Sequence, residues 1–246
     1  YEPGSTFKII TLATALEENV VDLEKDTFFD SGAITVEGAT LHCWKHGGHG
    51  AETYLQVVEN SCNPGFVNLG LKFGFGKKTG IDLNGESSGI IFNLDKVGPV
   101  ELATTAFGQG VSVTPIQQIT AVSAAINGGT LYKPYVVKSL NEPVTNTVVK
   151  QNEPTKVRTV ISEETSKKVR ETLESVVTNG TGRPAYIEGY RVGGKTGTAQ
   201  KVQNGRYMVG NYIVSFIGFL PADDPEIIVY VAVDNAKGVT PYGGTI

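Results

Sequence analysis

Apolar residues recur with helical spacing at the start of the chain, directly after the turn-forming pair Pro3-Gly4. The segment is apolar on nearly all sides, which is typical of a buried helix. The pattern predicts a helix whose first turn carries Ser5 and Lys8. Its apolar positions are Phe7, Ile9, Ile10, Leu12, Ala13 and Leu16.

Two short helices are predicted farther along, joined by a tight connection. Thr53 is a favourable N-cap for a helix that ends near Asn60, and Pro64 is suited to open the next helix. Ser61 and Asn63 would then lie between the two helices, with side chains free to point into a cleft. The competing interpretation is that both residues simply cap helices.

Start and stop signals set the bounds of the helix after Pro64 and define three more helices. A capping box at Thr114-Pro115-Ile116-Gln117 opens one of them, and glycines or Asn-Gly pairs end each one. We expect helices over 66–73 and 101–107, from Thr114 to Gly128, and from Ser162 to Asn179.

The last third of the chain has the pattern of β-strands joined by short turns, which favours antiparallel pairing of neighbours. Strands are expected over 192–199, 212–220 and 227–233, the last apolar enough to be central. Short strands or loop edges are expected at 28–29 and 33–36, loop over 74–98, and irregular strands and loop over 131–157. No repeat or linker divides the chain, so residues 1–246 are predicted to be a single domain.

Composition narrows the class of protein without naming a function. The chain has 246 residues, 40% of them hydrophobic and 19% charged, with a net charge of −4. This is ordinary for a globular protein and gives no sign of binding to nucleic acid or to an anionic membrane surface. No signal peptide or membrane-spanning run is visible. Because the chain lacks an initiator Met and opens inside a motif, we expect a fragment truncated at both ends.

The first turn of the first helix has the residues for an activated serine. Residues i and i+3 share a helix face, so the amine of Lys8 can reach the hydroxyl of Ser5. Serine is a weak nucleophile and needs an adjacent base, and burial lowers a lysine pKa enough to provide one. Taken alone, the pair is more often ordinary helix capping.

A second group of reactive residues is the loop His42-Cys43-Trp44-Lys45-His46-Gly47-Gly48-His49-Gly50. Structural zinc sites usually take two spaced pairs of ligands, and one cysteine among close histidines does not provide them. We therefore predict a glycine-rich loop with no metal ligand, and no cofactor.

Three short motifs occur in order along the chain: Ser5-Thr6-Phe7-Lys8, Ser61-Cys62-Asn63 and Lys195-Thr196-Gly197. Each is weak alone, but the combination is typical of penicillin-binding proteins and class A β-lactamases. Over almost its whole length the chain resembles the transpeptidase domain of class B penicillin-binding proteins, especially the sporulation and division types. Cys62, in place of Asp, favours a penicillin-binding protein over a β-lactamase. The resemblance extends to Tyr1-Glu2-Pro3-Gly4, Cys43-Trp44, Gly48-His49-Gly50, Gly108-Gln109-Gly110-Val111-Ser112-Val113-Thr114-Pro115 and Gly194-Lys195-Thr196-Gly197-Thr198-Ala199-Gln200.

The resemblance implies a role for each motif residue. Ser5 would attack the peptide bond between two D-alanines of a peptidoglycan stem peptide, with Lys8 as general base. Ser61, held by Lys195, would pass a proton to the leaving amine. Asn63 would orient Lys8 and bind a substrate amide. The Ser5 and Thr198 amides would form the oxyanion hole, and the substrate carboxylate would be bound by Lys195, Thr196, Gly197 and Thr198.

The resemblance also implies an α+β fold, with an antiparallel sheet packed against helices, a mainly helical region and the site in the cleft between them. The family's first strands and last helix would lie outside this chain, which would leave an unpaired sheet edge. The parent protein would be membrane-anchored on the extracytoplasmic face of the bacterial membrane, within a cell-wall synthesis complex. Its ligands would be stem peptides and β-lactam antibiotics.

Three other functions share these motifs. A serine β-lactamase or a D,D-carboxypeptidase would pass the acyl group to water, and a non-catalytic sensor would only bind β-lactams. No motif for a deacylating carboxylate is visible in the sequence.

The two cysteines, Cys43 and Cys62, leave the redox compartment open. We hypothesise that they can form a disulfide in an oxidising compartment. The bridge would fix the conformation of Ser61 and Asn63 and could switch the site off until it is reduced. The alternative is two reduced thiols packed as small hydrophobic side chains.

Overall fold

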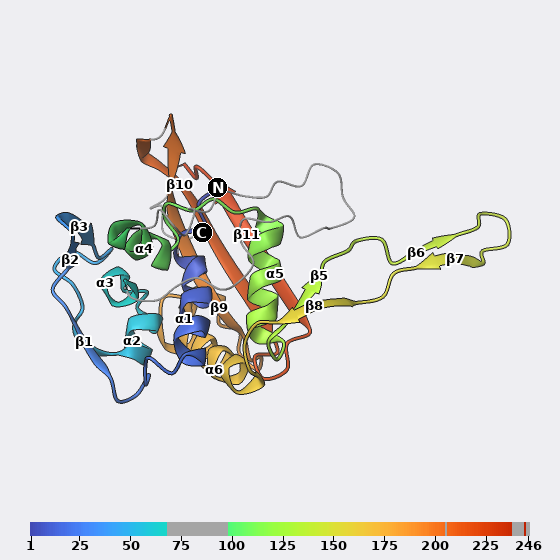
Figure 1. The fold of residues 1–246 in the computed structure, drawn as a ribbon, viewed down its shortest axis with the longest axis horizontal. Helices are drawn as coiled ribbons and strands as arrows, with labels where there is room; N and C mark the ends of the chain where they lie inside the picture. Colours follow the sequence, from blue (N-terminus) through green and yellow to red (C-terminus); the bar gives the residue numbers. More distant parts are fainter. Residues whose placement is uncertain (68–97, 205, 238–243, 245–246) are drawn as a thin grey trace.

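The computed structural model describes residues 1–67, 98–204, 206–237 and 244. Helices and antiparallel sheets give the α+β fold that the sequence predicted (Figure 1). The helix predicted over 66–73, beyond residue 67, and the loop predicted over 74–98, up to residue 97, lie outside the described residues.

The main sheet has the order β11-β10-β9, and both pairings are antiparallel. The strands are β9 (Gly193–Gln203), β10 (Arg206–Leu220) and β11 (Ile227–Asp234). The prediction that the strand at 227–233 is central was wrong for the described sheet, because β10 lies between the other two. β11 is an edge there, and alternate residues Ile227, Val229 and Val231 are about half exposed. An apolar sequence therefore did not imply burial on both faces.

Among the residues that the structure describes, seven helical segments cover the sheet and build the region beside it. They are η1 (Gly4–Phe7), α1 (Lys8–Glu17), α2 (Tyr54–Glu59), α3 (Asn63–Phe66), α4 (Pro99–Ala106), α5 (Pro115–Ile126) and α6 (Glu163–Asn179), with a further short turn, η3 (Arg183–Ala185). The predicted caps Thr53, Thr114 and Ser162 each accept a hydrogen bond from the third residue beyond them.

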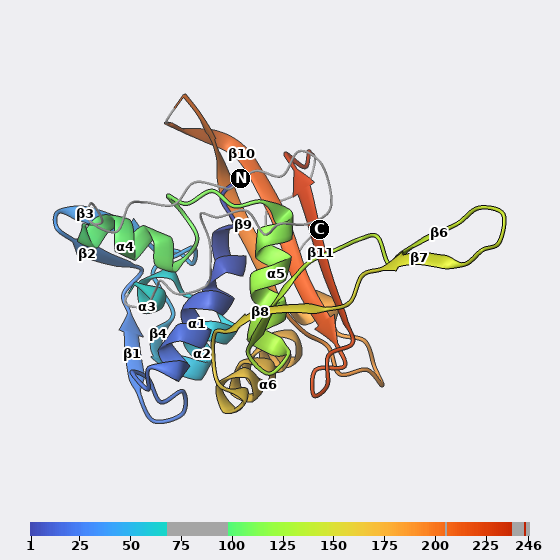
Figure 2. The ribbon, with the colours of Figure 1, turned by 45° about the vertical axis from the view of Figure 1, so that its right-hand side comes forward.

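Helix packing forms one large core next to the main sheet. Figures 1 and 2 show α1, α5 and α6 side by side, with α6 against β9 and α5 against β11. Apolar side chains from these helices and α2 meet Ile217 and Phe219 of β10 in the same cluster. Such burial is the main stabilising contribution to a fold. It supplies a rigid base for the segments that carry the three motifs.

Short two-stranded ribbons complete the described chain. The predicted strands at 28–29 and 33–36 are present as β1 (Thr27–Asp30) and β2 (Ala33–Val36), and their partners β4 (Gly50–Thr53) and β3 (Ala39–His42) were not predicted. Region 131–157 forms β5 (Thr130–Lys133) with β8 (Thr155–Thr159) and β6 (Ser139–Asn141) with β7 (Val148–Gln151). The β6–β7 ribbon extends away from the helices and the sheet in both views (Figure 2).

Two helix starts differ in detail from the prediction. Ser5 lies in the 3₁₀ turn η1 and Lys8 is the first residue of α1, so the first turn is tighter than an α-helical one. α3 starts at Asn63, one residue before Pro64. Among the helices that the structure describes, none combines the length and apolar character needed to cross a membrane.

Candidate active site

Ser5 is held close to β9 by the glycine that precedes it. Gly4 has a φ of +55°, and a Cβ built there would lie 2.7 Å from the carbonyl oxygen of Thr198. A glycine is therefore needed both for the backbone conformation and for the close approach. The Gly4 amide also donates to the Gly108 carbonyl at 3.0 Å. The approach to Thr198 places η1, which carries the first motif, against β9, which carries the third.

Lys8 lies in the protein interior, below the turn that carries Ser5. Its side chain is 1% exposed, and its Nζ donates to three oxygen atoms. The acceptors are the Ser61 carbonyl at 2.8 Å, the Ser61 hydroxyl at 3.1 Å and Asn63 Oδ1 at 2.7 Å. The first and second motifs thus meet at this amine. The role of Asn63 in orienting Lys8 stays a prediction, and this hydrogen bond is the contact through which it would act.

The electrostatic environment suits a lysine that loses its proton. Burial lowers the pKa of Lys8 to about 7, while the two nearby cysteines act in the opposite direction. Burial, and then the charge of Lys8, also hold the pKa of Lys195 well below its ordinary value. Near neutral pH a substantial fraction of Lys8 is therefore the free amine, which is the form a general base requires.

Ser61 lies in the connection between α2 and α3, and Asn63 is the first residue of α3. Ser61 has a φ of +53°, a left-handed conformation that costs a non-glycine residue about 1–3 kcal/mol. Neighbouring contacts hold it there: the Ser61 amide donates to the Val58 carbonyl at 3.1 Å, and Asn63 Nδ2 donates to the His42 carbonyl at 3.1 Å. The predicted capping role is not seen for Asn63, which begins α3 rather than preceding it.

The third motif is part of β9, which lies beside η1. Lys195 is fully buried, and its Nζ donates to the Thr196 carbonyl at 3.3 Å. Thr196 Oγ1 donates to Thr181 Oγ1 at 3.4 Å. The hydrogen bond recorded for Ser61 Oγ comes from Lys8, and the predicted support of Ser61 by Lys195 stays a prediction.

Residues of all three motifs surround one cavity of about 520 Å³. Lys8 lies outside the lining and connects to it through Ser61 and Asn63. The Ser5 hydroxyl, the Ser61 hydroxyl and a threonine-rich strand therefore face the same space, with the buried amine of Lys8 behind them. The lining residues are Ser5, Trp44, Ser61, Asn63, Phe107, Gln109, Thr181, Thr196, Thr198, Gln200, Tyr212 and Gly244.

Several of these lining residues were not predicted as site residues. Gln109 had a signal, because a polar side chain between two glycines suggests close approach to a ligand. Thr181 and Tyr212 had none, since they reach the cavity through packing: the Thr181 amide donates to the Glu59 carbonyl at 3.0 Å. Trp44 belongs to the predicted loop, and its indole donates to the Asn60 carbonyl at 2.8 Å.

A larger hollow, of about 680 Å³, lies between residues 16–26 and α6. Its lining includes Leu16, Asp22, Lys168 and Thr172 but no residue of the three motifs. Volume alone does not provide a nucleophile or a base, so the smaller cavity is the candidate active site.

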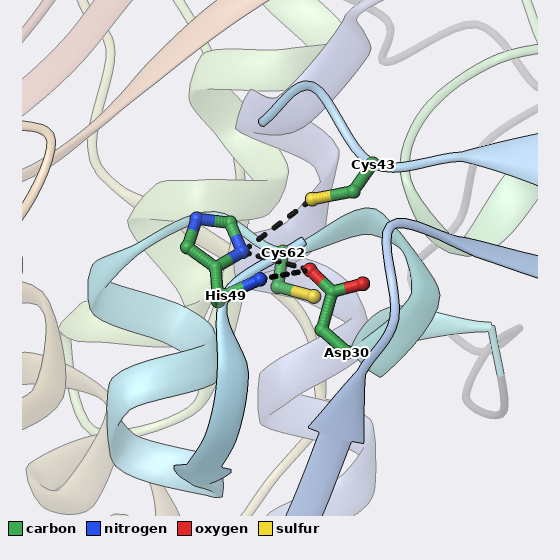
Figure 3. A group of neighbouring side chains, drawn as sticks. All are labelled: Asp30, Cys43, His49 and Cys62. Atoms are coloured by element: carbon green, nitrogen blue, oxygen red, sulfur yellow. Dashed lines mark hydrogen bonds and ion pairs between the residues drawn. The ribbon is translucent and has the colours of Figure 1, made fainter. Parts of the chain in front are cut away.

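Cys43 and Cys62, the latter between Ser61 and Asn63, lie close together in the interior (Figure 3), and both are free thiols in the structure. Their sulfur atoms are within 4.8 Å of each other and of ligand atoms of Asp30 and His49. A disulfide needs the sulfur atoms about 2 Å apart. The proposed bridge therefore stays a prediction, between residues that the fold does bring together.

Comparison with known proteins places the chain in a family. The model of the penicillin binding protein transpeptidase domain matches residues 1–246, so the chain belongs to this family. It is 65% identical to stage V sporulation protein D of Bacillus subtilis, across all of this chain and 40% of that protein. It is 31% identical to the peptidoglycan D,D-transpeptidase FtsI homolog of Mesostigma viride, across 96% of this chain and 45% of that protein.

Solved structures agree with this assignment. Penicillin binding protein 3 of Mycobacterium tuberculosis, solved in complex with ampicillin, superposes with a TM-score of 0.87 at 31% identity. The match covers 96% of this chain and 56% of that one. The chain spans about two fifths of the length of the first curated relatives that it matches.

Proposed function

We propose that these 246 residues form a single domain, the transpeptidase domain of a peptidoglycan-synthesising enzyme, and make peptide cross-links through an acyl-serine intermediate. The observation that carries the proposal is the arrangement around Lys8. A buried amine with a pKa of about 7 contacts Ser61 and Asn63, and these two residues share a cavity with Ser5.

In the first half of the reaction, the Ser5 hydroxyl attacks the carbonyl carbon between two D-alanines, and Lys8 accepts the hydroxyl proton. In the structure, the Lys8 amine donates three hydrogen bonds, two to Ser61 and one to Asn63. The neutral amine has only two N–H groups, so loss of one contact frees its lone pair for this proton.

Collapse of the tetrahedral intermediate breaks the C–N bond and releases the terminal D-alanine. Its amine receives a proton through Ser61, whose hydroxyl already contacts Lys8 at 3.1 Å. Amides of Ser5 and Thr198 stabilise the oxyanion, a contribution of roughly 3 kcal/mol for each donor. In the second half, the amine of another stem peptide attacks the Ser5 ester and forms the cross-link.

The substrate carboxylate is bound along β9 by the hydroxyls of Thr196 and Thr198 beside Gly197, with the amine of Lys195 behind them. Gly197 lets β9 lie close against η1 and β10: a Cβ at this position would lie 2.5 Å from Ser215 Oγ and 2.9 Å from a methyl carbon of Thr6. β-Lactams acylate the same serine, which fits the ampicillin complex solved for the M. tuberculosis relative.

The parent protein acts at the extracytoplasmic face of the bacterial membrane, held by an anchor outside these residues and working with other cell-wall synthesis proteins. This part of the proposal is supported by the family and by the names of the relatives that act in peptidoglycan synthesis and sporulation.

The test supplies the full chain with a stem pentapeptide donor and an amine acceptor, and separates the products by mass. We expect a cross-linked product and released D-alanine. Release of D-alanine without a cross-link would assign a carboxypeptidase, and rapid turnover of a chromogenic β-lactam would assign a β-lactamase. A stable covalent adduct with the β-lactam, without D-alanine release and without β-lactam turnover, would assign a non-catalytic sensor.

A further inference from the structure

Glu2 lies three residues before Ser5, and its carboxylate contacts two segments at the edge of the candidate active site. Its Oε1 accepts a hydrogen bond from the Gly110 amide at 3.0 Å and another from the Tyr207 hydroxyl at 3.3 Å. Gly110 follows Gln109, which lines the cavity, and Tyr207 belongs to β10. On the basis of the proposed function, we propose that Glu2 is a positioning residue, which holds Gln109 in the orientation that binds the stem peptide.

The segment Gly108-Gln109-Gly110 needs support from outside itself. Gly108 has a φ of +83° and Gly110 a φ of +74°, and glycines are free to leave such conformations, so the local sequence does not fix the side chain between them. The Gly108 carbonyl is held by the Gly4 amide at 3.0 Å. Glu2 holds the Gly110 amide on the other side. The two contacts therefore fix the backbone that orients Gln109.

The burial of the Glu2 carboxylate indicates a specific role. Its Oε2 atom is buried and, among the described residues, has no recorded hydrogen-bond partner. Burial raises the pKa of Glu2 above its ordinary value, whereas the Gly110 amide and the Tyr207 hydroxyl act in the opposite direction. Desolvation of a carboxylate is unfavourable, and an apolar side chain would avoid it. The two hydrogen bonds that offset this cost are the ones that reach the edge of the cavity.

Tyr207 extends the contacts of Glu2 to the main sheet. Burial, and then the charge of Glu2, raises the pKa of Tyr207 to about 12, so the hydroxyl stays protonated and can donate to the carboxylate. β9 and β10 also carry the lining residues Gln200 and Tyr212. Glu2 therefore joins two walls of the cavity, the segment around Gln109 and the β9–β10 pair.

The contacts of Glu2 bear on substrate binding rather than on the chemical step. Glu2 is not among the lining residues of the cavity, and its recorded hydrogen bonds do not reach Ser5 or Lys8. Gln109 does line the cavity, and its amide can both donate and accept, as the backbone of a peptide ligand requires. Loss of the Gly110 contact should therefore weaken the non-covalent complex and leave the rate of the acylation step nearly unchanged.

The first experiment measures acylation of the full chain by ampicillin, whose side-chain amide stands in for the peptide backbone. Its concentration dependence separates the dissociation constant of the non-covalent complex from the first-order rate of acylation. We expect Glu2→Ala to raise the dissociation constant by roughly threefold to tenfold, the effect of losing one hydrogen bond. The acylation rate should change by less than about twofold. Glu2→Gln keeps an oxygen for the Gly110 amide and should stay close to the wild type, as should the control Glu188→Ala, an exposed glutamate.

A double-mutant cycle separates positioning from a general effect on stability. Gln109→Ala should raise the dissociation constant as Glu2→Ala does, and the double variant should be no weaker than the weaker single variant, because Glu2 acts through Gln109. A merely structural role would lower the melting temperature and the fraction of protein that forms an adduct, without changing the constants of the folded fraction. Independent, multiplying effects of the two substitutions on the dissociation constant would overturn the proposal.

Amide hydrogen exchange tests the same contact without any ligand. The Gly110 amide should be protected in the wild type and exchange faster in Glu2→Ala, while Tyr207→Phe should leave it protected. A wild-type Gly110 amide that exchanges as an unprotected one would overturn the proposal even if Glu2→Ala failed to fold. An unchanged dissociation constant in folded Glu2→Ala would overturn it as well. A wild type that forms no ampicillin adduct would instead contradict the proposed function, and the exchange result would still decide the role of Glu2.

Discussion

Lys8 Nζ donates a 2.7 Å hydrogen bond to Asn63 Oδ1, joining residues 55 positions apart in the sequence. The bond connects the first motif to the second inside the protein, where the amine is shielded from water. The carbonyl and hydroxyl of Ser61 accept the other two hydrogen bonds of this amine. The Lys8 side chain is therefore oriented toward the segment that contains Ser61 and Asn63.

Lys8→Met should remove the base and keep most of the apolar volume. We expect acylation by a β-lactam to slow by roughly a hundredfold to ten-thousandfold, the usual contribution of a general base. Stopped-flow or quenched acylation kinetics measure the rate, and circular dichroism checks the fold. An unchanged rate in the folded variant would exclude Lys8 as the base.

The rate of acylation should depend on pH through the charge of Lys8. The reactive form is the free amine, whose fraction rises with pH when the pKa is about 7. We therefore expect the second-order rate constant for acylation to increase between about pH 6 and pH 8 and then level off. A flat profile over this range would contradict the assignment.

Asn63→Asp should shift the pH profile of the acylation rate to higher pH. A carboxylate at 2.7 Å favours the charged lysine and raises its pKa. The pH at half-maximal rate should increase by about one unit or more, while the plateau rate at high pH changes less. Gln109→Glu is the matched control, because it adds the same charge to the cavity lining at a position with no recorded contact to Lys8. Equal midpoints in Asn63→Asp and the wild type would show that the contact does not set the Lys8 pKa.

Gly4→Ala should damage both stability and acylation, since its Cβ would collide with the Thr198 carbonyl and its φ is unfavourable for alanine. We expect a loss of about 2–4 kcal/mol in the free energy of unfolding. Gly38→Ala is the control: it shares a positive φ, but nothing lies within 4 Å of its Cβ, so the loss should be about 1 kcal/mol. Chemical denaturation measures the free energy of unfolding of both variants. Equal losses would mean that the close approach of residue 4 to the Thr198 carbonyl does not add to the cost of the substitution.

Local patterns in the sequence predicted much of this fold. The caps Thr53, Thr114 and Ser162 start helices where expected, because capping depends on neighbouring residues only. The antiparallel pairing of neighbours that was expected in the main sheet already places β10 between β9 and β11, and the β2–β3 pairing is equally local. The partner of β1 could not be predicted in the same way, because the residues that pair between β1 and β4 are at least 20 positions apart and another strand pair lies between them.

The residues of the site also divide into those with a local signal in the sequence and those placed by contacts distant in sequence. Ser5, Ser61 and Lys195 could be found from motifs, since short spacing carries the signal. Thr181 reaches the cavity through its backbone bond to Glu59, and Asp30 meets Cys62 only after β1 and the α2–α3 connection have packed. Neither contact leaves a pattern in the local sequence, which is why the cluster in Figure 3 was not predicted.

The most direct test of the central claim is mass spectrometry of the folded protein after treatment with penicillin. The account predicts one covalent adduct per chain that maps by peptide analysis to Ser5 and is absent from Ser5→Ala, whose melting temperature should stay close to that of the wild type. An adduct that persists in Ser5→Ala, or no adduct in a wild-type protein shown to be folded, would contradict it.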